Sequence, residues 1–192
     1  MTDQVRFLDR RAALTAGAQT LSAAGVLAVL GVATPRGALA AAKPSQDVQL
    51  LNAAIALEHE GIAAYQIAAE SGLLSPGVLK VGVTFQGHHK QHRDALADAV
   101  RRLGGKPVQA KGLSAYAADL GAGGLKDEVG VMKLALKLER GAANAYLGLI
   151  PSLGGTDLHL LTARMAGDEA FHAAILASAL GEALPQNALM FG

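Results

Sequence analysis

The strongest constraint on the fold is a short pattern that occurs twice in the chain. Glu58 is followed seven residues later by Tyr65, and Glu139 is followed seven residues later by Tyr146. In both copies a Leu precedes the Glu and an Ala precedes the Tyr. Because seven residues make two turns of an α-helix, the Glu and the Tyr of each copy lie on the same helix face. The pattern therefore predicts two helices that each present a carboxylate and a phenol to one side.

A second pattern follows each copy of the first. His89-x-x-His92 follows the first copy, and Glu169-x-x-His172 follows the second. From the Glu of the first pattern to the last His, the separation is 34 residues in one copy and 33 in the other. The chain is therefore a helical hairpin repeated twice, with its polar residues at matching places.

Four long segments have apolar residues at the three- and four-residue steps of a helix. We expect helices over about 46–70, 76–103, 126–149 and 156–180, separated by Gly, Ser and Pro. The Gly- and Ala-rich stretch 108–124, with one helical turn, is long enough to cross from one end of a bundle to the other. The predicted fold class is all-α, a four-helix bundle built from two helical hairpins with a long crossover.

Composition supports a helical core and excludes several kinds of site. Apolar residues make up 51% of the chain and aromatic residues only 4%, which suits closely packed helices. The chain has no Cys, so any metal must be held by His and carboxylates. Beyond residue 40 there are 13 basic and 14 acidic residues, so no basic stripe indicates a nucleic-acid partner.

The doubled spacing places six donor groups at the centre of the bundle. Residues three apart on a helix lie on one face and are close enough to bind the same metal site. Two such pairs on two helices, with one Glu from each of the other two helices, form the arrangement that binds two iron or manganese ions in helical bundles. The candidate metal ligands are therefore Glu58, His89, His92, Glu139, Glu169 and His172.

These residues resemble the ferritin-like superfamily, which includes ferritins, bacterioferritins and rubrerythrins. The outline is most similar to the exported ferritin-like domain proteins of bacteria, and the resemblance covers about residues 46–180. It implies an up-down-down-up bundle whose cofactors are two divalent metal ions, iron first, with manganese or zinc as alternatives. It also implies that Tyr65 and Tyr146 are catalytic residues beside the metal, acting in hydrogen bonding or electron transfer.

One position departs from the family pattern. His89 stands where the family has the first Glu of a Glu-x-x-His pair. The ligands then comprise three carboxylates and three neutral imidazoles, so two divalent ions would leave a charge of about +1 instead of zero. A neutral imidazole cannot bridge two metals as a carboxylate does. A mononuclear, mixed-metal, zinc-loaded or weaker site therefore stays open, and His88, four residues before His92, could compete as a ligand.

Structural interpretations compete with the metal site. His88, His89 and His92 could form a surface patch beside Lys90 and Arg93. The two tyrosines could be core residues with satisfied hydroxyls. The six polar residues could also pair with one another in a bundle that has lost its metal. Against this last alternative, the two glutamates of the first pattern lie in apolar segments, where a buried carboxylate is costly unless it is paired or bound to metal.

The first 40 residues have the order of an export signal. A polar, basic start ends in Arg10-Arg11, and mostly small or apolar residues without charge follow over 12–33. Ala38-Leu39-Ala40 has the small residues of a cleavage site. The adjacent arginines resemble a twin-arginine signal, so the folded protein is expected in the periplasm or beyond. If the segment is retained, it would anchor the protein in the membrane. The predicted organisation is a signal (1–40), a linker (41–45), the bundle (46–181) and a tail (182–192).

Three functions fit these residues. The first is a metal-dependent oxidoreductase that acts on oxygen or peroxide, as the resemblance implies. The second is a metal-binding or stress-protective bundle without turnover, and the third is a structural or interaction module that has lost the metal. The expected partners are metal ions and a small oxidant, with no nucleic acid. A homodimer fits the sequence but is not required by it.

Overall fold

The computed structural model describes residues 45–191 of the chain. Four long helices lie within them: α2 (Gln46–Glu70), α3 (Pro76–Arg102), α5 (Glu128–Leu149) and α6 (Thr156–Ala179). The short helices are α4 (Leu113–Asp119) and the 3-10 helices η2 (Ala122–Gly124) and η3 (Ile150–Ser152). No strand occurs in this part of the chain. The predicted export signal and most of the linker lie outside the described residues.

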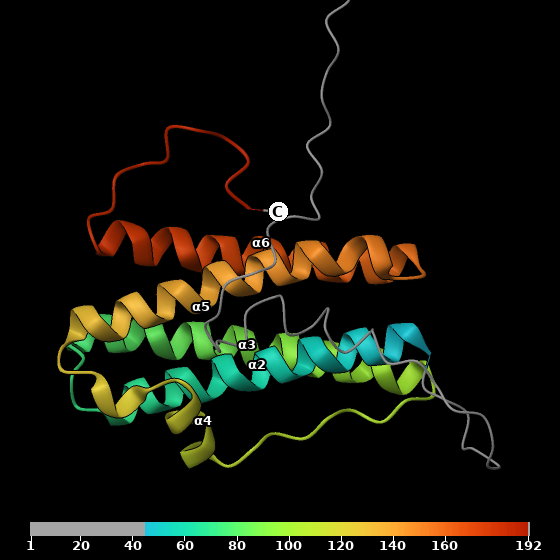
Figure 1. The fold of residues 1–192 in the computed structure, drawn as a ribbon, viewed down its shortest axis with the longest axis horizontal. Coiled ribbons are helices and arrows are strands. Elements are labelled where there is room, and N and C mark those ends of the chain that lie inside the picture. The colour runs from blue at the N-terminus through green and yellow to red at the C-terminus, as the bar shows by residue number, and fades with distance from the viewer. Residues whose placement is uncertain (1–44, 192) are drawn as a thin grey trace, which may run out of the picture.

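The long helices form two antiparallel hairpins (Figure 1). α2 packs along α3, and α5 packs along α6, while the contacts between the hairpins are fewer. The segment that follows α3 returns along the length of the bundle, and α4 within it lies against α2. α5 therefore runs in the same direction as α3. The resulting up-down-down-up order with a long crossover confirms the predicted fold class.

Side-chain caps place the helix starts close to the positions expected from the sequence. Ser45 caps α2, because its Oγ accepts a hydrogen bond from the Val48 N–H at 3.3 Å. Asp127 caps α5 in the same way, accepting from the Gly130 N–H at 2.7 Å. The third long helix consequently begins at Glu128, two residues later than the sequence pattern suggested.

The core consists of two apolar clusters, one toward each end of the bundle. The first cluster joins the start of α2 to the end of α3 and contains Leu51, Ile55, Leu96 and Val100. The second joins the start of α3 to the end of α6 and contains Phe85, Met132, Leu136 and Leu176, with Phe191 of the tail packed against it. Each large side chain buried in this way contributes about 1.5–3 kcal/mol. The two clusters thus hold the four helices together on both sides of a layer that contains polar residues.

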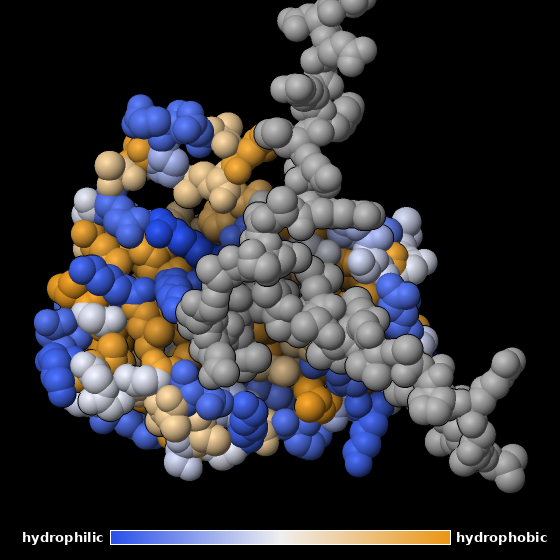
Figure 2. All heavy atoms as spheres, in the orientation of Figure 1, coloured by the Kyte–Doolittle hydropathy of each residue, from blue (hydrophilic) through white to orange (hydrophobic). Residues whose placement is uncertain are grey.

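The outer face of the bundle mixes apolar and charged side chains. Figure 2 shows apolar side chains reaching the surface among charged ones at the end of the bundle where α5 begins. Among the helices of residues 45–191, none has both the length and the hydropathy needed to cross a bilayer.

Candidate metal centre

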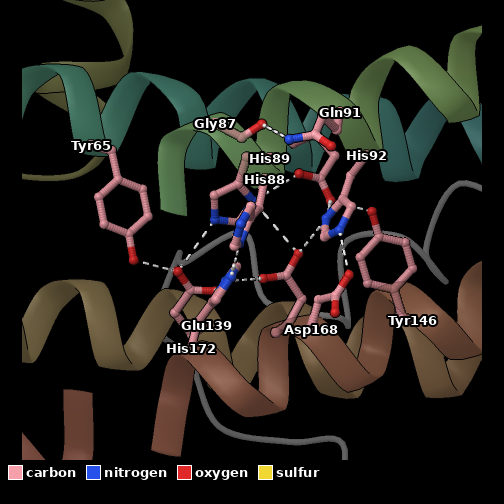
Figure 3. A network of polar contacts seen from close by, with 12 residues as sticks. Tyr65, Gly87, His88, His89, Gln91, His92, Glu139, Tyr146, Asp168 and His172 are labelled. Atoms are coloured by element: carbon pink, nitrogen blue, oxygen red, sulfur yellow. Dashed lines mark hydrogen bonds and ion pairs between the residues drawn. The ribbon is translucent and has the colours of Figure 1, made fainter. Parts of the chain in front are cut away.

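Six polar side chains meet in the layer between the two apolar clusters (Figure 3). Each of them is at most 7% exposed to solvent. They come from all four long helices: Glu58 from α2, His89 and His92 from α3, Glu139 from α5, and Glu169 and His172 from α6. The structure thus brings together all six residues that the sequence suggested as metal ligands. The surface-patch interpretation does not hold for His89 and His92, because both are buried.

The donor atoms fall into two overlapping groups of four. In each group the four nitrogen or oxygen atoms lie within 4.8 Å of one another, which is close enough for one metal ion. The first group consists of Glu58, His89, His92 and Glu169, and the second consists of His89, Glu139, Glu169 and His172. The two groups share His89 and Glu169, so any two ions bound there would be neighbours.

Glu169 lies between the two groups and offers one carboxylate oxygen to each. Its Oε1 is 3.0 Å from Nδ1 of His92, and its Oε2 is 3.0 Å from Nδ1 of His172. The three-residue spacing on α6 brings Glu169 and His172 onto the same helix face. A carboxylate placed in this way can bridge two cations.

His89 occupies the matching place on α3 and spans the cluster with its ring. Its Nδ1 is 2.8 Å from Oε2 of Glu58, and its Nε2 is 3.2 Å from Oε1 of Glu139. Gly61 of α2 lies against this ring, and a Cβ there would be only 3.1 Å from Nδ1 of His89. The residue that departs from the family pattern therefore points into the cluster, in a space that lacks a neighbouring side chain.

Both tyrosines donate a hydrogen bond to a glutamate of the other hairpin. The Tyr65 hydroxyl donates to Oε1 of Glu139, and the Tyr146 hydroxyl donates to Oε1 of Glu58. Figure 3 shows the two rings at opposite ends of the cluster. Burial raises the pKa of both phenols, and the neighbouring carboxylates raise it further, so each hydroxyl stays a donor.

Two further residues contact the outer nitrogens of the histidines. Nδ1 of His88 is 2.9 Å from Nε2 of His172, and Oδ2 of Asp168 is 3.1 Å from Nε2 of His92. His88 thus reaches the far side of a candidate ligand and does not enter the carboxylate cluster. Sequence reasoning missed Asp168. The sequence did contain a signal for Asp168. It precedes His172 by four residues, as His88 precedes His92, so the two residues occupy equivalent positions in the repeated hairpin.

In the first donor group, the histidines act as counter-charges of the glutamates when no metal is bound. Burial by itself raises the pKa of Glu58, but hydrogen bonds and charges from His89 and His92 outweigh it and hold that pKa below its usual value. Burial likewise opposes the charged form of His92, yet the hydrogen bonds and charges of Glu169 and Glu58 raise its pKa to about 10.

In the second donor group, hydrogen bonds and charges also outweigh the effect of burial on the pKa values, except at Glu169. Burial raises the pKa of Glu139, but hydrogen bonds from His172 and His89 prevail and lower it. The pKa of His172 is raised by Glu139 and Glu169 against the effect of burial. For Glu169 burial prevails over the hydrogen bonds from the histidines, and its pKa lies above the usual value. A nearby cation would therefore favour the charged form of Glu169.

The residues present fit divalent cations. Carboxylate oxygen and imidazole nitrogen are ligands that suit iron, manganese and zinc. Three carboxylates buried side by side need positive charge near them, and either protonated imidazoles or metal ions can supply it. In residues 45–191 every buried side-chain nitrogen or oxygen has a hydrogen-bond partner. The cluster is therefore a complete polar site that can exchange protons for metal.

The sequence and the fold also match known proteins. A family model described as a ferritin-like domain matches residues 46–182. The chain belongs to the ferritin-like domain family. The bundle is similar to the crystal structure of a conserved hypothetical protein, rv2844, from Mycobacterium tuberculosis, with a TM-score of 0.60. Sequence identity is 23%, over 74% of this chain and 94% of that one, so this likeness bears on the fold alone. No curated protein matches the chain.

Proposed function

We propose that this ferritin-like protein is a metal-dependent oxidoreductase that holds two divalent ions, iron or manganese, and acts on oxygen or peroxide. The observation that carries the proposal is the position of Glu169, whose two oxygens face the two donor groups. Each group would hold one ion, and ions of this kind supply Lewis acidity and redox equivalents when bound.

Other residues of the chain orient the ligands. The hydroxyls of Tyr65 and Tyr146 hold Glu139 and Glu58 in fixed orientations from opposite ends of the cluster. Asp168 accepts from the outer nitrogen of a histidine, which leaves the inner nitrogen to face the carboxylates. The six side chains are themselves buried, and removal from bulk water strengthens the electrostatic contacts among them.

Metal binding without turnover is a second candidate, and His89 favours it. With a ring in place of a carboxylate, the ligands carry one negative charge fewer than the usual four-carboxylate site. A more positive site disfavours the loss of further electrons from the ions. The same six residues would then hold the ions statically.

The test is the consumption of oxygen and peroxide by the purified full chain loaded with iron. Glu169→Gln keeps the shape of a side chain that both groups share, and Glu70→Gln is the matched control on an exposed carboxylate of α2 outside both groups. We expect turnover in the wild type and in the control, and at least about a tenfold loss in Glu169→Gln. Iron-loaded wild type without turnover would support static binding, and wild type that binds no metal would contradict both candidates.

We also infer from the sequence of residues 1–40 that the protein works outside the cytoplasm. The inference rests on the paired arginines and the uncharged segment after them. Cell fractionation with an Arg10→Lys, Arg11→Lys variant checks it. Wild type inside the cytoplasm would contradict export.

A further inference from the structure

A cavity of about 700 Å³ borders the candidate metal centre. Its walls come from α2, α3, α5 and the crossover between the hairpins. Its inner wall includes Tyr65, His89 and Glu139, which belong to the buried cluster. The volume lies within the range of about 300–1,000 Å³ that is usual for ligand sites in proteins. The buried centre is thus adjacent to a space large enough for an organic molecule.

The cavity is elongated along the bundle. On α2 its lining extends from Leu57 to Ala69, and on α5 it extends from Val131 to Ala145. At a rise of about 1.5 Å per residue these stretches are roughly 18 and 21 Å long. A space that extends this far along the helices can accommodate an extended chain.

The cavity has apolar walls and a charged rim. Most of its lining is Leu, Val, Ile, Ala and Gly, while Lys111, Asp119 and Lys137 are exposed residues at its edge. Lys111 and Asp119 are paired with each other at 3.0 Å, so they do not point to a particular headgroup. An apolar molecule that leaves water for such walls gains the free energy of hydrophobic burial. A second protein copy would cover only the rim, because the walls belong to several elements and the residues of the inner wall are buried.

We propose that this cavity binds an elongated apolar molecule, such as an alkyl or acyl chain, which passes beside Tyr65 and Glu139. Binding follows from the shape and the lining of the cavity alone. The role of the bound molecule as a second reactant rests on the proposed function of the metal centre.

Two glycines on α5 provide a matched pair of variants. A Cβ at Gly141 or at Gly148 would meet nothing within 4 Å, so a larger side chain fits at either place. Gly141 lines the cavity, whereas Gly148 is exposed and does not. Gly141→Leu therefore fills the cavity, and Gly148→Leu makes the same change of helix propensity outside it.

The experiment titrates the purified full chain with the fluorescent polyene fatty acid cis-parinaric acid. We expect saturable binding to the wild type and to Gly148→Leu within about twofold, and at least about tenfold weaker binding to Gly141→Leu, because overfilling a site costs that much. No binding to the wild type, or equal binding to all three proteins, would overturn the proposal. If the wild type binds no probe and Gly141→Leu changes the oligomeric state, the proposal is also overturned, because the cavity would then belong to an interface between copies.

The metal content of the same three proteins separates this inference from the proposed function. Probe binding that responds to Gly141→Leu in a protein without metal would support the cavity site and contradict the metal centre. Two bound ions without probe binding would support the metal centre and contradict the cavity site.

Discussion

Among the glycines of residues 45–191, Gly61 is the one whose added Cβ would come closest to a residue of the candidate metal centre, His89. A Cβ at position 61 would lie 3.1 Å from Nδ1 of His89 and 3.2 Å from Cε1. In the second hairpin Ala142 takes the equivalent place, three residues after Glu139, and the counterpart of the histidine is the slimmer Glu169. The larger side chain, His89, is thus accompanied by the smaller neighbour, Gly61, so the helix packing leaves room for the ring inside the cluster.

We predict that Gly61→Ala weakens metal binding. In an ordinary helix this change stabilises the fold by about 0.5–1 kcal/mol. Here the new methyl group pushes the His89 ring away from Glu58, and displacing the support of a ligand lowers metal affinity by about 10–100-fold. Metal titration and thermal unfolding of Gly61→Ala measure both effects. Gly167→Ala is the control, because its Cβ meets nothing within 4 Å, and it should keep full affinity. Equal affinity of both variants would show that the ring is not confined.

At the scale of the helices, the sequence predicted most of what the structure shows. Apolar periodicity, Pro, Gly and Ser located all four long helices to within two residues at either end. The doubled spacing placed all six polar residues on inward faces. The spacing of residues within one helix does not reveal which side chains of the other hairpin they contact, because those contacts depend on how the two hairpins pack. The crossed contacts of Tyr65 with Glu139 and of Asp168 with His92 therefore appeared only in the structure.

Asp168 gives a prediction at the scale of the helices, because it joins α6 to the candidate ligand His92 on α3. We expect Asp168→Asn to lower metal affinity by about 10–100-fold, since the carboxylate fixes the ring of His92 through its outer nitrogen. Asp98→Asn is the matched control, an exposed aspartate of α3 that pairs only with Arg101 in a surface contact. Metal titration of both variants measures the two affinities, and we expect the loss in Asp168→Asn alone. A loss of affinity in the control of the same size would point to the general surface charge instead.

For the whole molecule, the polar layer couples metal binding to pH. The pKa of His92 is raised from 6.5 to about 10, so its contribution to stability is complete below pH 6.5 and is lost as the pH rises toward 10. The pKa of Glu58 is lowered from 4.5, so its contribution is complete above pH 4.5 and is lost as the pH falls. Between these limits both charges are present in the folded protein.

We predict that the metal-free protein becomes less stable when the pH rises from about 6.5 to about 9.5, with a fall in Tm of at least about 5 °C. The histidines must be neutral to bind metal, so protons compete with the ions, and the stabilisation by added metal should grow over the same interval. Thermal unfolding with and without manganese across this pH range measures both trends. A metal-free Tm that rises or stays level would show that the histidines are not charged in the fold.

The number of ions that each chain binds tests the central claim most directly. It is measured by elemental analysis of the full chain after manganese loading and removal of the excess, in the wild type and in three Glu→Gln variants. We predict about two ions in the wild type, about one in Glu58→Gln and in Glu139→Gln, and close to none in Glu169→Gln, because the first two residues each serve one donor group and Glu169 serves both. A single ion in the wild type, or the same count in Glu169→Gln as in the wild type, would contradict a shared two-ion centre.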